Sequence, residues 1–208
     1  MASKVYDIKS IRKKLKKELD KDRYEHTKGV MYTAACLAMS TGYEDIDKAM
    51  LAGLLHDCAK CISDSEKIAI CRDADVEIAP VEIQNPFLLH SKAGAIVARD
   101  KYGIEDEEIL NAIRVHTTGM PNMSLLDKIV YVADYIEPRR NRMPRLQFIR
   151  KKAFEDIDKC VAYISGDTLK YLQSKKGSID KTSELTYEYY KDYIRGDMKT
   201  VSEEKLED

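Results

Sequence analysis

Apolar residues recur along most of the chain at the three- and four-residue spacing of amphipathic helices, and no segment shows the alternation of a half-buried strand. We therefore expect an all-α fold. The pattern predicts helices over about 8–19, 22–40, 46–55, 64–72, 89–102, 106–116 and 124–137, and further amphipathic helices near 146–175 and 183–194.

Proline, glycine and capping residues mark where these helices begin and end. The stretch DADVEIAPVEIQNPF, residues 73–87, carries Pro80 and Pro86 and is expected to be an irregular loop. Ser124 is a favourable N-cap, and Asp127 three residues later occupies the capping-box position. The short basic sequence RRNRMPR, residues 139–145, is predicted to be a loop.

We expect one domain over residues 1–195. Its core, about 22–140, carries the polar motifs considered below, and a helical layer over about 146–195 covers it. The last residues, 196–208, are acidic and are expected to form a frayed tail.

Composition excludes several classes of protein. The 208 residues are 44% hydrophobic and 34% charged with a formal net charge of −1, so nothing global favours nucleic acid or an anionic membrane as a partner. No apolar run approaches the roughly 20 residues of a membrane span, and the N-terminus lacks the apolar region of a signal peptide. The five cysteines, an odd number, favour free thiols in the reducing cytoplasm.

Candidate chemistry begins with the histidines, of which the chain has four: His26, His56, His90 and His116. Any one of them, taken alone, is better explained as a surface or core residue. Two aspartates change this interpretation. Asp57 directly follows His56, and Asp134 lies on the apolar helix face IVYVAD, where burying an unpaired carboxylate would be costly. A metal cation would satisfy Asp134, as would an arginine or lysine partner.

The order His26, His56-Asp57, Asp134 resembles the H…HD…D pattern of the HD-domain metal-dependent phosphohydrolases. The flanking sequences RYEHTKGV, AGLLHDCAK, LLHSKAG, IRVHTTG and KIVYVADYIEPRR are similar to the YqeK family of symmetrical bis(5′-nucleosyl)-tetraphosphatases, over residues 23–140. The resemblance implies an HD-domain helical bundle with additional C-terminal helices. It also implies a homodimer that splits diadenosine tetraphosphate into two molecules of ADP.

Four residues are the predicted metal ligands: His26, His56, Asp57 and Asp134. A cation held by imidazole and carboxylate lowers the pKa of bound water and polarises a phosphoryl oxygen, which hydrolysis of a phosphoanhydride requires. The expected reaction is attack of the metal-bound water on a central phosphorus. Ligands of this type suit iron, manganese or zinc, and the resemblance implies iron.

Cationic side chains stand close in sequence to these ligands and are predicted to bind phosphate. Arg23 lies one helical turn before His26, and Lys60 lies three residues past Asp57. Arg139 and Arg140 follow a helix end, where a guanidinium can bind phosphate bidentately.

His90 and His116 are open to three interpretations: phosphate contacts, proton donors to the leaving oxygen, or ligands of a second metal. The resemblance implies substrate contacts. Thr117, Thr118 and Gly119 form a polar turn suited to hydrogen-bonding a phosphate or ribose, unless the turn simply ends the helix.

Cys58 and Cys61 have the C-x-x-C spacing, but no second pair or histidine unit completes a zinc site, so we interpret both as small buried or half-buried thiols. Two other functions remain open: another HD-type nucleotide phosphohydrolase, or a non-catalytic nucleotide-binding regulator. The complete set of ligand-type residues argues against the regulator, since binding alone does not need all four.

Overall fold

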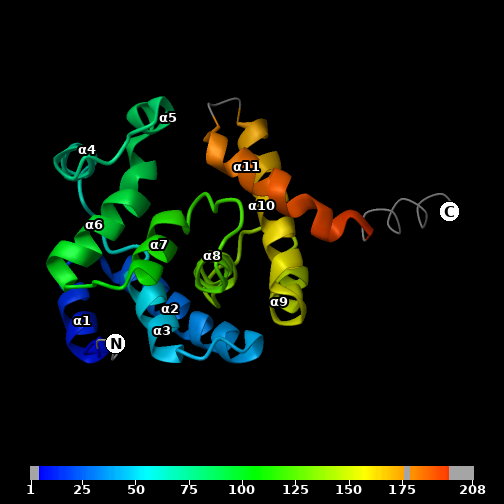
Figure 1. The fold of residues 1–208 in the computed structure, drawn as a ribbon, viewed down its shortest axis with the longest axis horizontal. Helices are drawn as coiled ribbons and strands as arrows, with labels where there is room; N and C mark the ends of the chain where they lie inside the picture. Colours follow the sequence, from blue (N-terminus) through cyan, green and yellow to red (C-terminus); the bar gives the residue numbers. More distant parts are fainter. Residues whose placement is uncertain (1–4, 176–178, 197–208) are drawn as a thin grey trace, which may run out of the picture.

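The computed structural model of the chain describes residues 5–175 and 179–196, and these form helices without a single strand (Figure 1), which confirms the predicted all-α class. The α-helices are α1 (Ile8–Leu15), α2 (Lys21–Thr41), α3 (Ile46–Leu55), α4 (Asp64–Asp73), α5 (Pro80–Gln84), α6 (His90–Tyr102), α7 (Glu107–Val115), α8 (Leu125–Ile136), α9 (Leu146–Glu155), α10 (Ile157–Ser174) and α11 (Lys181–Tyr190). Two short 3₁₀ helices, η1 (Pro86–Leu89) and η2 (Lys191–Ile194), complete the described elements.

Helix α8 runs through the middle of the molecule, between the N-terminal helices and the layer of α9–α11 (Figure 1). It packs against α2, α3 and α7 on one side and against α9 and α10 on the other. Its residues Ile129, Val130, Val132 and Ala133 are fully buried. Each large aliphatic side chain buried in this way contributes roughly 1.5–3 kcal/mol. Packing on both sides therefore fixes where the side chains of α8 point.

Helices α2 and α3 lie close together because small residues line their contact. Ala34 and Ala38 of α2 and Ala49 and Ala52 of α3 are all buried. Side chains of this size let two helix backbones approach, since they leave little volume between the axes. The close pairing brings the inner face of α2 next to the end of α3.

Capping residues begin the helices where the sequence indicates. The hydroxyl of Ser124 accepts the backbone N–H of Asp127 at 3.1 Å, and the Asp127 carboxylate accepts the N–H of Ser124 at 2.9 Å, so the predicted capping box is confirmed. The side chain of Asp20 caps α2 by accepting the N–H of Arg23 at 2.8 Å. These caps satisfy N–H groups that the first helical turn leaves free.

The prediction of an irregular loop over residues 73–87 is wrong in part, because this stretch contains α5 and η1. Both begin with a proline, which the first position of a helix tolerates since its missing N–H would be unpaired there. The carboxylate of Glu82, only 4% exposed, accepts the N–H of Ala79 and pairs with Lys92 at 2.7 Å. The two prolines therefore start short helices here.

Other helix boundaries also differ from the pattern. The first helix ends at Leu15, although Leu19 is still buried with 7% exposure. The region 146–175 divides at Asp156, whose extended backbone ends α9 and whose side chain caps α10. Of the predicted acidic tail, residues 197–208 lie outside the part of the chain that the structure describes.

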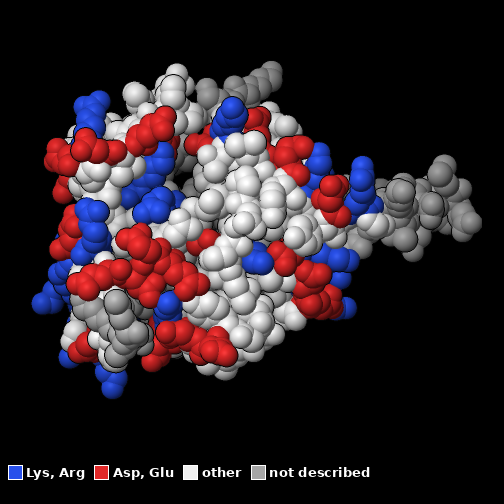
Figure 2. All heavy atoms as spheres, in the orientation of Figure 1, with Lys and Arg blue, Asp and Glu red and all other residues white. Residues whose placement is uncertain are grey.

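Charged side chains are unevenly spread over the surface. On the face shown in Figure 2, residues other than Lys, Arg, Asp and Glu cover the area over α8–α11, and acidic and basic side chains gather over the helices on the left and along the right side. Among the described residues, no helix has the length and apolar character needed to span a membrane.

Gly119 gives a test of how the turn after α7 packs. Its φ is +66°, and an added Cβ would lie 2.7 Å from Thr186 Cγ2 of α11. Gly103 has a similar φ of +69° but open space around it. Gly103→Ala should cost about 1–2 kcal/mol of unfolding free energy from backbone strain alone. Gly119→Ala should cost roughly 1–3 kcal/mol more, because Thr186 must move.

The measurement is chemical denaturation of both variants beside the unmodified protein. Equal losses in the two variants would show that the turn does not pack against α11 as described.

Candidate metal centre

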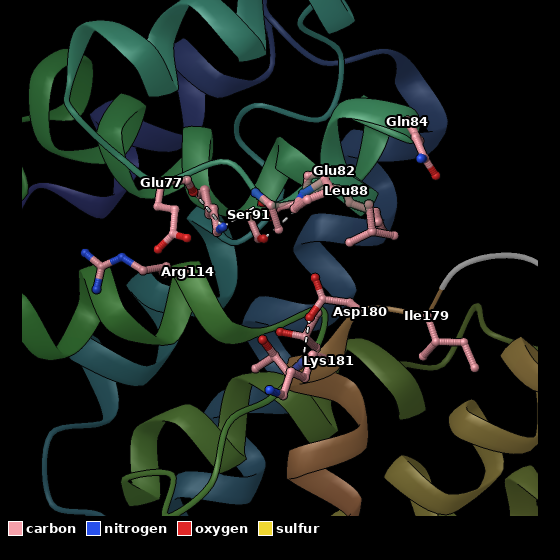
Figure 3. A pocket seen from close by; sticks show the side chains of 15 residues that line it. Glu77, Glu82, Gln84, Leu88, Ser91, Arg114, Ile179, Asp180 and Lys181 are labelled. Atoms are coloured by element: carbon pink, nitrogen blue, oxygen red, sulfur yellow. Dashed lines mark hydrogen bonds and ion pairs between the residues drawn. The ribbon is translucent and has the colours of Figure 1, made fainter.

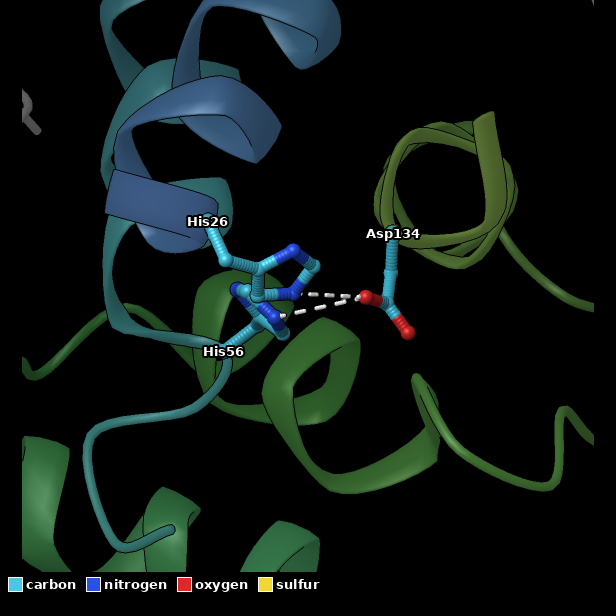
Figure 4. A group of neighbouring side chains, drawn as sticks. All are labelled: His26, His56 and Asp134. Atoms are coloured by element: carbon cyan, nitrogen blue, oxygen red, sulfur yellow. Dashed lines mark ion pairs between the residues drawn. The ribbon is translucent and has the colours of Figure 1, made fainter. Parts of the chain in front are cut away.

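Polar side chains from three helices meet beside the central helix. His26 projects from α2, His56 caps the end of α3 with Asp57 next to it, and Asp134 projects from α8. His26 Nε2 lies 2.9 Å from Asp134 Oδ1, and His56 Nε2 lies 3.7 Å from the same oxygen (Figure 4). Asp57 Oδ2 lies 3.4 Å from His56 Nε2 and 3.8 Å from His26 Nε2. The structure thus brings the four predicted ligands together.

Several nitrogen and oxygen atoms in this group that could bind a metal are buried without a hydrogen-bond partner. They are His26 Nε2, His56 Nε2 and Asp57 Oδ1. The short contact between His26 and Asp134 lacks the direction of a hydrogen bond. Buried polar atoms are nearly always paired, so three unpaired ones at one place require an explanation. A cation between them would supply it, and the residues present therefore fit a bound metal.

The second ring nitrogen of each of these histidines is already engaged. His56 Nδ1 lies 2.7 Å from the carbonyl oxygen of Gly53, and His26 Nδ1 lies 3.0 Å from Glu137 Oε1. A carbonyl oxygen can only accept, so Nδ1 of His56 must carry the proton and Nε2 holds a free lone pair. This arrangement leaves both Nε2 atoms, which lie 2.9 Å and 3.7 Å from Asp134 Oδ1, free to bind a metal.

Charge in the site is balanced by close contacts. Burial opposes ionisation of both carboxylates. For Asp57 the contacts with His56, His116 and Lys60 together outweigh that effect. For Asp134 the contacts with His26 and Arg140 do so, and both pKa values therefore lie well below their ordinary range. Burial lowers the pKa of His56. Anionic carboxylates and the neutral imidazole of His56 are protonation states that bind a metal. Burial opposes charge on His26, but its contacts with Asp134 and Glu137 outweigh burial and raise its pKa.

His90 and His116 form a second cluster beside Asp57. Their Nε2 atoms lie 3.2 Å apart, and 3.4 Å and 3.7 Å from Asp57 Oδ1. Lys60 Nζ lies 3.0 Å from His90 Nε2, and the Thr117 hydroxyl lies within 3.2 Å of both rings. Burial, with His116 and Lys60, lowers the pKa of His90 to about 3.

These two rings are oriented in the same way as His56. His90 Nδ1 donates to the carbonyl oxygen of Phe87, and His116 Nδ1 to that of Ile113, each at 2.7 Å. Their Nε2 lone pairs therefore also face the shared space. His56, Asp57 and His116 offer ligand atoms within 4.8 Å of one another, as do His26, His56 and Asp134. The geometry can hold one cation or two.

Arginines from both ends of the motif region flank the carboxylates. Arg23 Nη1 lies 2.6 Å from Asp57 Oδ2, and Arg140 Nη2 lies 2.6 Å from Asp134 Oδ1. Arg139 points elsewhere: its side chain is 53% exposed and lies 3.7 Å from Asp22. Of the two consecutive arginines, Arg140 is thus the one beside the predicted ligands.

A cavity of about 250 Å³ opens from this cluster. Arg23, Lys60, His90, His116 and Thr117 of the predicted site line it, whereas Thr118 does not. Its other walls include Tyr131, Tyr135, Met143, Ile164 and Thr168. Sequence reasoning missed these wall residues, because their place depends on how α10 packs on α8.

Glu137 is the other residue that sequence reasoning missed. It is 1% exposed, holds His26 Nδ1 and accepts the backbone N–H of Arg139 at 2.8 Å. The sequence does contain a pattern that points to Glu137, because this residue lies three positions after Asp134 in an otherwise apolar segment.

Arg150 of α9 fixes the segment that follows α8. Its guanidinium donates to the carbonyl oxygens of Ile136, Glu137 and Arg140, each at 3.0 Å. The C-terminal layer thereby holds the backbone that carries Glu137 and Arg140.

A separate hollow of about 510 Å³ lies between α5, α6, α7 and the start of α11 (Figure 3). Thr118 lines it, together with acidic and basic side chains such as Glu82 and Lys92, which pair with each other. Of the described residues, the groups that could hold a metal lie at the histidine cluster rather than in this hollow.

Comparisons with known proteins agree with this geometry. A family model of the HD domain matches residues 23–139. The chain is 40% identical over 173 residues to a protein of Halalkalibacterium halodurans named bis(5′-nucleosyl)-tetraphosphatase, symmetrical, covering 83% of this chain and 91% of the relative. A Bacillus subtilis protein of the same name is 39% identical, with 84% and 92% covered.

Among solved structures, the chain resembles one from Clostridium acetobutylicum described as a predicted HD superfamily hydrolase involved in NAD metabolism. The TM-score is 0.86 and the sequence identity 40%, over 91% of this chain and 100% of that chain.

Nε2 of each of the four histidines lies within 3.8 Å of an Asp57 carboxylate oxygen, so we expect Asp57→Ala to purify without bound metal. Metal content per chain, measured by mass spectrometry without added ions, checks this. The control is Asp47→Ala, an exposed aspartate at the start of α3. Metal retained by Asp57→Ala at the level of the control would refute the assignment of Asp57.

Glu137→Gln should weaken metal binding by about 10- to 100-fold, because the carboxylate orients His26 and raises its basicity. The affinity is measured by competition with a chelator. Glu82→Gln is the matched control, since Glu82 is also a buried carboxylate but pairs with Lys92. Equal affinity in the two variants would contradict an orienting role for Glu137.

Proposed function

The chain belongs to the HD-domain family and, within it, to the symmetrical bis(5′-nucleosyl)-tetraphosphatases, and on this basis we propose that it hydrolyses diadenosine tetraphosphate into two molecules of ADP. One observation carries the proposal: His26, His56 and Asp57 present unpaired buried donor atoms beside Asp134. Such a site can hold a metal ion, which can activate a water and relieve phosphate charge for the hydrolysis of a phosphoanhydride at neutral pH.

His26, His56, Asp57 and Asp134 would hold the metal. When bound, it supplies an activated water and neutralises charge on the phosphates. Arg23 and Arg140 support the proposal as phosphate-binding groups because both line the cavity beside the predicted ligands, where Asp57 and Asp134 hold them at 2.6 Å. Guanidinium groups oriented in this way stabilise the charge that develops as the central P–O bond breaks.

We propose that Lys60, His90, His116 and Thr117 contact the substrate. Lys60 and Thr117 lie within hydrogen-bond distance of His90 Nε2, so these donors can turn to phosphate oxygens when substrate enters. The ammonium and the hydroxyl would then hold the phosphates in place. Of the two imidazoles, His116 suits proton donation to the leaving oxygen better, because the low pKa of His90 keeps that ring neutral.

Thr118 and Arg139, also predicted to bind substrate, lie outside the cavity, so a role for them requires substrate to extend beyond it. We propose residues 1–195 as one functional domain, because Ile164 and Thr168 of the C-terminal layer line the cavity and Arg150 holds the segment after α8.

Iron is the metal that we propose, as the family resemblance implies, although nitrogen and oxygen ligands also suit manganese and zinc. We propose a homodimer for the same reason. Exposed apolar side chains on α10, α11 and η2 support it: Tyr171, Leu185 and Tyr193 are each more than two-fifths exposed. A cytoplasmic location is supported by the five cysteines, all free in the structure.

Incubation with diadenosine tetraphosphate and separation of the nucleotides tests the proposed reaction. We expect ADP as the sole product and loss of turnover after chelation, with recovery on adding iron, manganese or zinc. The products AMP and ATP would contradict symmetrical cleavage. Absence of turnover with every metal would favour a nucleotide-binding regulator.

A further inference from the structure

Two hollows meet at the metal centre. The cavity described above is lined by Asp57 and Asp134. A larger and more open hollow of about 650 Å³, here called the outer groove, is lined by His26 and Glu137. Arg23, Arg140 and Met143 line both. The predicted metal ligands therefore lie at the junction of two spaces.

Size indicates that one space alone is insufficient. Pockets that enclose drug-sized ligands measure roughly 300–1,000 Å³. A molecule with two nucleosides and four phosphates is larger than such ligands, and the cavity of about 250 Å³ cannot enclose it. Symmetrical cleavage also places the reacting phosphates at the middle of the molecule. Its two halves must then leave the metal centre in two directions.

The two spaces differ in chemistry. The cavity has an aromatic and apolar wall that includes Tyr131, Tyr135 and Ile164, which suits a purine base. The outer groove carries the additional cations Arg139 and Arg142 on the loop after α8. Arginine binds phosphate bidentately and stacks on a flat base, so this loop suits a second, more exposed nucleoside diphosphate.

The acidic groups of the outer groove do not cancel these cations. Asp20 is occupied in capping α2, and Glu137 in holding His26. Asp22 is exposed and only 3.7 Å from Arg139, a contact that phosphate can replace.

From this geometry, and resting on the proposed function, we propose that the two halves of the substrate bind on opposite sides of the metal centre. One nucleoside diphosphate half occupies the cavity, and the other lies along the outer groove against Arg139 and Arg142. Arg23 and Arg140, which line both spaces, face the phosphates between the halves. Free ADP binds in the cavity, where the contacts are more numerous and more buried.

The test compares two ligands on one pair of variants. The ligands are ADP and a diadenosine tetraphosphate analogue whose central bridging oxygen is replaced by methylene, so that it resists hydrolysis. The variant is Arg139→Ala/Arg142→Ala. The control is Arg72→Ala/Arg99→Ala, which removes the same charge from exposed sites; Arg99 is 52% exposed, against 53% for Arg139. Calorimetry gives the Kd of each ligand.

We expect the groove variant to weaken binding of the analogue by about tenfold, since two charged contacts are lost, and to leave the Kd of ADP within about twofold. The control should change neither. An unchanged Kd for the analogue would overturn the proposal. An equal loss for both ligands would also overturn it, because the arginines would then act on the half in the cavity.

Binding of the analogue does not depend on turnover, so this result stands apart from the proposed reaction. If the unmodified protein binds the analogue but does not cleave diadenosine tetraphosphate, the proposed function fails and the measurement on the groove remains valid.

Discussion

The carboxylates of Asp57 and Asp134 lie where burial opposes negative charge, and much of the structure serves to keep them ionised. Imidazoles and guanidinium groups approach them from several helices, and the balance leaves donor atoms without partners. Replacing buried charged side chains of this kind by well-packed hydrophobic residues often stabilises a protein. The free-energy cost of burying these carboxylates and imidazoles is consistent with a site kept for its chemistry, since a cation would pair with the atoms that have no partner in the protein.

The sequence predicted the helical class, most helix positions and the residues that come together, because these depend on local patterns. Periodic apolar residues predict helices, and a polar residue on an apolar face, such as Asp134, is conspicuous in one dimension. The prolines of residues 73–87 led to the incorrect prediction of a loop, since in the sequence a proline at the first position of a helix cannot be told from one that breaks a helix. Ile164 and Thr168 could not be assigned to the cavity, because no local signal tells which face of α10 meets α8.

The C-terminal layer contributes to the site through the backbone. Arg150 donates to four carbonyl oxygens at the end of α8 and in the segment after it, and that segment carries both Glu137 and Arg140. The chain thereby connects a helix far from the HD motif in sequence to the orientation of His26. A family match that ends at residue 139 does not include this support.

The four imidazoles differ in how easily a mutation can remove the group that orients the ring. His56, His90 and His116 donate to the carbonyl oxygen of the residue three positions earlier, an acceptor that every amino acid possesses. Substitution at those earlier positions cannot delete the partner, so the orientation of these rings tolerates sequence drift as long as the helix end is kept. His26 relies on a side chain from another helix end. Its orientation can be lost in one mutational step, and positions 26 and 137 are therefore expected to change together among distant relatives.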